Sequence, residues 1–160
     1  MVDPFIIIRR RPYEEPYHTQ LEITVSNGVF GGSTDIYCNV DDLAEIGCGL
    51  REFSAKISDD YRFEYGSENP ATRFYRYFLL RAYALDSLGH CAIQFAMNLN
   101  EAEPNEGVCK LSIPAEPMAI NRLGTLFESF GKLSHLELRW SPKHGRLYDN
   151  YQDEASDLLL

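Results

Sequence analysis

The sequence predicts an α+β domain, with a mostly antiparallel β-sheet and two helices packed on one face. The chain has 160 residues, of which 44% are apolar and 24% charged, enough for one domain with a sizeable core. Segments of alternating apolar and polar residues follow one another across short turns, and short turns join antiparallel strands. Two other segments repeat apolar residues at helical spacing. The order strands, helix, strands, helix, strand is typical of an α+β fold.

A first hairpin is predicted over residues 20–40, after a short strand at residues 5–10. Asn27 and Gly28 both tolerate a positive φ and favour a two-residue turn. Such a turn places Val25 opposite Phe30. The apolar positions of the first strand then share one face: Leu21, Ile23 and Val25.

The first helix is predicted to begin at Asp41 and Asp42, whose carboxylates suit the positive end of a helix. Glu45 lies three residues after Asp42, as in a variant of the capping box. One apolar stripe follows at spacings of three and four: Leu43, Ile46, Leu50, Phe53 and Ile57. A short alternating strand is then predicted over residues 61–65.

The second hairpin is the clearest element of the sequence, with its turn at residues 86–89. Pairing Leu85 with His90 brings the apolar residues of both strands to one face. That register also sets Phe78 opposite Met97 and Leu80 opposite Phe95. After this hairpin, Cys109, Leu111 and Ile113 alternate in another strand, Pro117 to Gly131 bound a helix, and Leu136, Leu138 and Trp140 form a last strand.

No linker, repeat or low-complexity segment divides the chain, so residues 1–160 are predicted to form a single domain. Its core is expected at about residues 18–140. Residues 1–17 are expected to be an N-terminal strand and arm, and residues 141–160 an acidic C-terminal tail.

Composition bounds the compartment and the partners. The net charge of −9 argues against a nucleic-acid binder, which needs a basic face for phosphates. No signal peptide is visible, and no apolar stretch reaches the roughly 18 residues of a membrane helix. The cysteines at positions 38, 48, 91 and 109 lack a C-x-x-C spacing and are expected to be reduced. We therefore expect a cytoplasmic protein that binds neither nucleic acid nor membrane.

Motifs for catalysis or metal binding are weak. The histidines, at positions 18, 90, 135 and 144, have no metal-ligand spacing, and the glycines of the first hairpin form no phosphate-binding loop. Asp86, Ser87 and His90 lie in one tight turn, where a catalytic triad rarely reaches its geometry. Asp86 and Gly89 instead fit the first and last positions of a type I turn. We expect no enzyme, no metal and no cofactor.

One strand face is a candidate partner-binding site, because tyrosine and arginine are enriched at interface hot spots. The alternative is that the arm or the tail covers this face, or that its arginines and tyrosines merely stack on each other. Its residues come from the second hairpin and the segment before it: Arg73, Tyr75, Tyr77, Arg81, Tyr83, Gln94 and Asn98.

Over residues 18–140 the sequence resembles the WapI-like bacterial immunity proteins and related bacterial families found near polymorphic toxins. The segments that carry the resemblance are LEITVSNGVFGGSTDIYCNV, DDLAEIGCGLREF, YRFEY, LLRAYALDSLGHCAIQFAMNL and AINRLGTLFESF. The resemblance implies a non-catalytic protein that binds and neutralises a cognate toxin, and it supplies no catalytic residue. An acidic chain would complement a basic toxin.

The sequence therefore predicts a non-enzymatic protein-binding module, in particular an immunity protein with a basic protein partner. Two alternatives stay open. One is a small-molecule-binding domain or minor enzyme with a pocket between sheet and helices. The other is a homo-oligomer that uses the Tyr/Arg strand face against itself. The identity of the partner or ligand and the oligomeric state are left open by the sequence.

Overall fold

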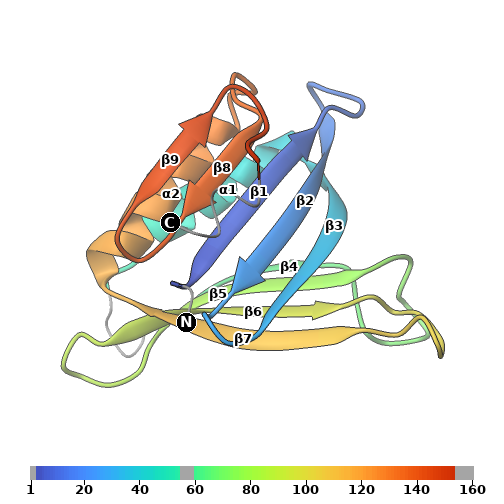
Figure 1. Ribbon diagram of the computed structural model, residues 1–160, viewed down its shortest axis with the longest axis horizontal. Coiled ribbons are helices and arrows are strands. Elements are labelled where there is room, and N and C mark those ends of the chain that lie inside the picture. The colour runs from blue at the N-terminus through green and yellow to red at the C-terminus, as the bar shows by residue number, and fades with distance from the viewer. Residues whose placement is uncertain (1–2, 55–59, 154–160) are drawn as a thin grey trace.

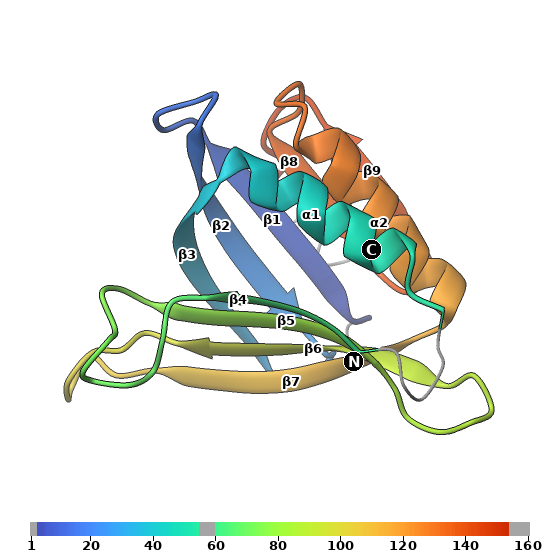
Figure 2. The same cartoon turned by 180° about the vertical axis from the view of Figure 1, so that it is seen from behind.

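The computed structural model describes residues 3–54 and 60–153 (Figure 1). It contains two antiparallel sheets and two helices, so the predicted α+β class is confirmed. The strands expected in one sheet divide between two. Figures 1 and 2 show that the second sheet runs crosswise beneath the first.

The first sheet has five strands in the order β3-β2-β1-β8-β9. Its central strand is the N-terminal one, and its β8 and β9 come from the C-terminal part of the chain. Strands from the N-terminal and the C-terminal parts of the chain therefore build one surface. The bounds are Phe5–Arg11 for β1, His18–Ser26 for β2, Gly31–Asn39 for β3, Glu137–Trp140 for β8 and Gly145–Tyr148 for β9.

The second sheet has four strands in sequence order. Their bounds are Asp60–Tyr65 for β4, Tyr77–Ala84 for β5, Cys91–Asn98 for β6 and Val108–Ala115 for β7. The predicted register of its central hairpin is confirmed: Phe78 pairs with Met97, and Leu80 pairs with Phe95. The two sheets meet at Gly32, where a Cβ atom would lie 2.9 Å from the Cβ atom of Cys109.

The helices are α1, Val40–Arg51, and α2, Pro117–Phe130. At the start of α1 the backbone N–H of Asn39 donates to the Asp42 carboxylate at 3.0 Å. Both helices pack against each other on the inner side of the five-stranded sheet (Figure 2). The predicted stripe of α1 is buried as far as Phe53, and Ile57 lies outside the described residues. Among the described residues, no helix has the length and apolar character needed to cross a membrane.

Two predictions about local structure and extent are corrected. The first hairpin has a four-residue loop, because the Asn27 side chain accepts the backbone N–H groups of Val29 and Phe30. Val25 therefore faces Gly32 and leaves Phe30 exposed. The core also extends beyond residues 18–140, since β1 lies within 1–17 and β9 lies within 141–160.

Candidate functional site: the outer face of the five-stranded sheet

The candidate site is the outer face of the five-stranded sheet, the side turned away from the helices. No described helix covers this face (Figure 1). Strand register defines its rows, because residues paired across antiparallel strands point to the same side. One row is Ser33, Thr24, Ile7, Arg139 and Arg146; the next is Asp35, Glu22, Arg9, Glu137 and Tyr148; a third begins Tyr37, Gln20 and Arg11.

Positive charge is concentrated on one half of this face. The outward positions of β1, β8 and β9 carry four arginines, at 9, 11, 139 and 146, and one carboxylate, Glu137. The chain as a whole has a net charge of −9. The half of the outer face formed by β1, β8 and β9 is therefore a local basic surface on an acidic protein.

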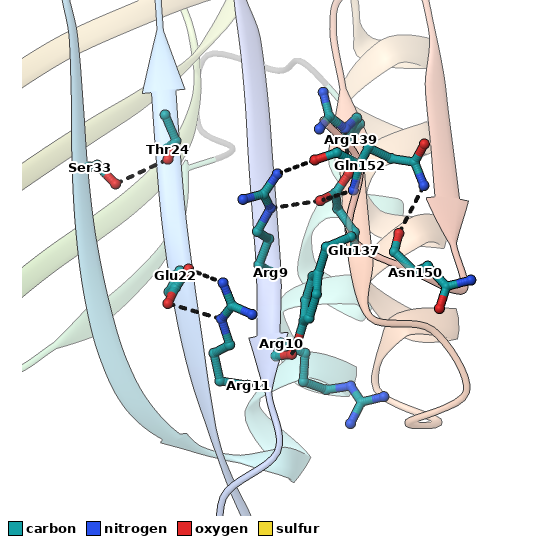
Figure 3. Close-up of polar contacts among 11 residues, drawn as sticks. Arg9, Arg10, Arg11, Glu22, Thr24, Ser33, Glu137, Arg139, Asn150 and Gln152 are labelled. Atoms are coloured by element: carbon teal, nitrogen blue, oxygen red, sulfur yellow. Dashed lines mark hydrogen bonds and ion pairs between the residues drawn. The ribbon is translucent and has the colours of Figure 1, made fainter. Parts of the chain in front are cut away.

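Glu137 is the centre of a buried ion cluster (Figure 3). Its carboxylate accepts hydrogen bonds from the Nε atom of Arg9 at 2.7 Å and from the Nε atom of Arg139 at 2.5 Å. The backbone N–H of Gln152 donates to the same carboxylate at 3.2 Å. The Glu137 side chain is 0% exposed, and those of Arg9 and Arg139 are 14% and 12% exposed. The cluster fixes both guanidinium groups on the face and, through Gln152, ties to it the C-terminal segment, residues 149–153.

Arg11 and Tyr151 form a second, more exposed group. The Arg11 guanidinium donates two hydrogen bonds to Glu22, at 3.0 and 3.1 Å (Figure 3). This bond is the main reason that the pKa of Arg11 is raised. The hydroxyl of Tyr151 donates to the carbonyl of Arg10 at 2.6 Å. That bond holds the Tyr151 ring between Arg11, 4.1 Å from the ring centroid, and Arg9, 5.9 Å away.

Tyr148 repeats this arrangement on β9. Its ring centroid lies 4.8 Å from the guanidinium carbon of Arg146 and 5.9 Å from that of Arg139. Each of these two tyrosines is thus flanked by two arginines, as in cation–π contacts. The pattern Arg–Tyr–Arg occurs twice on one open sheet face.

A third aromatic group lies at the β3 edge. The rings of Tyr13 and Tyr37 are 5.4 Å apart, and those of Tyr37 and Tyr75 are 5.6 Å apart. The Tyr75 hydroxyl donates to Asp35 at 2.8 Å. Desolvation, followed by this bond, raises the pKa of Tyr75. Aromatic rings therefore occur at both edges of the outer face.

Two hollows open on the outer face and share Ile7 in their lining. The basic hollow, about 610 Å³, lies where β1 begins and the β8–β9 hairpin turns, and its cationic lining residues are Arg139, Lys143 and Arg146. The mixed hollow, about 450 Å³, lies over β1, β2 and β3. Its lining includes both basic and acidic side chains: Arg9, Glu22, Asp35 and Arg76.

The site predicted from sequence lies elsewhere. Tyr77, Arg81, Tyr83, Gln94 and Asn98 come together on the outward side of the four-stranded sheet. Arg73 and Tyr75 precede β5, and Tyr75 lies beside Tyr37 and Asp35 instead.

On that sheet, polar side chains bond mainly to one another. Tyr77 is 9% exposed; its hydroxyl donates to Glu64 at 2.7 Å, and desolvation together with this bond raises its pKa to about 12. Arg81 stacks on Tyr83 at 4.3 Å and binds Asp60. Asn98 donates to Glu68 at 2.9 Å. The alternative that arginines and tyrosines of this face merely stack on each other therefore describes the Arg81–Tyr83 pair.

Sequence reasoning missed Arg9, Arg11, Arg139, Arg146 and Tyr148 as a group. A signal was present, because Arg9 and Arg11 alternate with inward residues and the segments ELRW and GRLY alternate likewise. Pairing between β1 and β8 spans about 130 residues of sequence, and only this pairing joins the two arginine groups. As to metals, no group of three or more potential ligand residues occurs within residues 3–54 and 60–153.

No protein-family model and no curated protein matches this chain. Among solved structures, the plant transcriptional regulator PBF-2 aligns with a TM-score of 0.46 and 11% identity, over 82% of this chain and 78% of that one. WHY3 from Arabidopsis thaliana aligns with a TM-score of 0.42 and 10% identity, over 81% and 78% of the two chains. Likeness at this level assigns no residue of this chain a role.

These neighbours contradict the predicted function. One of them is a transcriptional regulator, and against this finding the prediction of a toxin-neutralising, protein-binding module with a basic protein partner is wrong. The expectation that the chain binds no nucleic acid is corrected with it. Net charge sums over the whole surface, so it does not show that four of the 15 lysines and arginines lie together on one half of this face. The resemblance to WapI-like proteins stays a prediction, without the function that it implied.

Proposed function

We propose that this chain is a non-catalytic protein that binds single-stranded nucleic acid along the outer face of the five-stranded sheet. The observation that carries the proposal is the repeated Arg–Tyr–Arg arrangement, with Tyr148 and Tyr151 as the central rings. Aromatic rings stack on bases of any sequence, and arginines neutralise phosphates and add cation–π contacts. The face offers both partners in alternation.

The shape of the face favours a single strand over a duplex. A duplex keeps its bases stacked inside, and its major groove admits a helix or a two-stranded ribbon. The site here is the broad face of a five-stranded sheet, with its tyrosines lying on the strands and on the C-terminal segment. Unstacked bases can lie on such rings.

The carboxylates on the face set the strength of binding. Glu22 and Glu137 already bind Arg11, Arg9 and Arg139, so these arginines reach phosphates only in competition with them. We expect about three phosphates to be neutralised, with a salt slope, d log K/d log[salt], near −2. Affinity would then fall about twentyfold between 50 and 200 mM salt.

The test is fluorescence anisotropy with a labelled oligothymidylate and a labelled oligouridylate of 15 nucleotides, at three salt concentrations. Tyr148→Ala and Tyr151→Ala should each weaken binding about tenfold, since one stacked base contributes roughly 1–3 kcal/mol. The matched control is Tyr83→Ala, which removes a tyrosine stacked on Arg81 from the other sheet. No binding at 50 mM salt, or equal losses in all three variants, would overturn the proposal.

We also propose a reducing compartment, the cytoplasm, from the cysteines. All four are free thiols. Burial raises the pKa of Cys38 to about 12, and the Cys91 thiol donates to the carbonyl of Ala115 at 3.0 Å. Buried thiols persist where the cell keeps them reduced.

A further inference from the structure

The basic hollow is built at a corner of the outer face. Its lining carries Arg139, Lys143, His144 and Arg146, with Asp3 as its carboxylate. The strand at this edge of the sheet is β9, so the hollow lies where a path across the face would end. Its volume, about 610 Å³, falls within the range of small-molecule sites.

Two arginines of the hollow stand directly opposite each other. Arg139 pairs with Arg146 across β8 and β9, and like charges in this position destabilise a sheet. Glu137 offsets the charge of Arg139. Within the part of the chain that the structure describes, Arg146 and Lys143 make no ion pair. An anion bound between Lys143 and Arg146 would offset the charge of Arg146 and so reduce its repulsion with Arg139.

The turn that carries Lys143 is held in place before any ligand arrives. The Ser141 Oγ atom accepts the backbone N–H groups of Lys143 at 3.3 Å and His144 at 3.1 Å. The backbone N–H of Ser141 donates to the carbonyl of His144 at 2.7 Å. From α2, Arg122 donates to the carbonyls of Ser141 and Pro142, each at 3.0 Å. A fixed turn lowers the entropic cost of binding.

The rest of the hollow is apolar or aromatic. Phe5 and Ile7 line it from outward positions of β1, and Tyr148 lines it from β9. Trp140 also lines it from β8, but its side chain is 2% exposed and its indole N–H donates to the carbonyl of Ala119 in α2. A cationic rim beside an aromatic wall suits a molecule with an anionic end and a flat, apolar end. A nucleotide has both parts.

We propose that the basic hollow binds the terminal nucleotide of a single strand, with its terminal phosphate monoester between Lys143 and Arg146 and its base against Tyr148. A terminal phosphate carries between one and a half and two negative charges, about twice the charge of an internal phosphate. The position of the hollow at a corner of the outer face suits the end of a bound nucleic-acid strand. This inference rests on the proposed function, because it places one end of the same bound strand.

The test compares three 12-nucleotide strands: one with a 5′-phosphate, one with a 3′-phosphate and one with neither. One terminal phosphate should raise affinity about fivefold at 0.1 M salt, the effect of roughly one more neutralised charge. The gain should vanish in Lys143→Ala/Arg146→Ala. It should persist in the control Lys110→Ala/Lys132→Ala, which changes net charge equally at exposed positions outside the hollow.

The outcomes separate the two proposals. If all three strands bind equally well, the terminal-nucleotide site is wrong and the proposed function stands. If no strand binds at 50 mM salt, the proposed function fails. Binding of adenosine monophosphate is then measured, to test by itself whether the hollow is a nucleotide site. Saturable binding of that nucleotide, lost in Lys143→Ala/Arg146→Ala, would support the hollow as a nucleotide site, and its absence would overturn it.

Discussion

Replacing Glu137 by glutamine should change stability and binding in opposite directions. Glu137 is fully buried and binds two guanidinium groups that are themselves mostly buried. Removing one partner of a buried ion cluster costs about 3–5 kcal/mol, because the remaining charges lose their compensation. Glutamine keeps the volume and one acceptor oxygen, so we expect about 3 kcal/mol. For a domain of this size that lowers the Tm by roughly 6–12 °C.

The same substitution removes a negative charge from the outer face. In the variant no carboxylate competes with phosphates for Arg9 and Arg139 at this position. Affinity for a single strand should therefore rise about fivefold at 0.1 M salt. Stability is measured by thermal unfolding monitored by circular dichroism. Affinity is measured by anisotropy at 10 °C, where the variant remains folded.

The matched control is Glu22→Gln, two strands away in the same row, with Arg9 between the two glutamates. Glu22 binds Arg11, but the side chains are 40% and 37% exposed, so water replaces the lost bond. We expect a Tm within about 3 °C of wild type and a similar gain in affinity. Equal Tm values for Glu137→Gln and Glu22→Gln would refute the buried-cluster reasoning. Unchanged affinity in both would refute the electrostatic part.

Three further predictions concern the packing of the helices, a buried thiol and two tyrosines of the four-stranded sheet. In Gly124→Ala a Cβ atom would lie 2.6 Å from the Gly47 carbonyl oxygen, so urea unfolding should show a loss of about 1–3 kcal/mol despite alanine's helix preference, whereas the exposed Thr125→Ala should change little. With its pKa raised to about 12, Cys38 is thiolate in only about one molecule in ten thousand at pH 8; mass spectrometry should find it unalkylated by iodoacetamide until urea is added, and equal labelling in both states would contradict this. Burial raises the pKa of Tyr61 and of Tyr77 to about 12, so their contribution to stability is complete below about pH 10 and is lost as pH rises through 12; a urea midpoint that stays constant from pH 9.5 to 11.5 would contradict this.

The two hairpins show which part of the fold is local information. The register of β5 and β6 could be predicted because both strands alternate strictly and Leu85 donates to the carbonyl of His90, which closes the turn. The β2–β3 turn was predicted too tight because Asn27 uses its side chain to bind two backbone N–H groups. Composition alone does not distinguish that loop from a two-residue turn.

The division into two sheets depends on distant contacts. Central strand β1 pairs with β2, its neighbour in sequence, and with β8, which lies near the other end of the chain. Strand β9 has only four residues, and two of them are exposed, so its pattern is weaker than that of a buried strand. The outer face could not be predicted either, because Arg9 and Arg146 come to lie on one surface only when β8 pairs with both β1 and β9.

The net charge of the chain is a poor guide to the charge of one face, because salt limits the distance over which charges act. Strands lie about 4.8 Å apart, so a five-stranded sheet is roughly 20 Å wide. At physiological salt the Debye length is about 8 Å, and carboxylates on other faces are largely screened from this one. A phosphate at β8 and β9 is therefore governed by Arg139, Lys143 and Arg146, and only weakly by the −9 of the whole chain. At salt concentrations near 0.01 M the Debye length reaches about 30 Å, and the acidic remainder of the protein would then oppose the basic face. Recognition of a phosphate depends on the net charge of the groups within about one Debye length of the site.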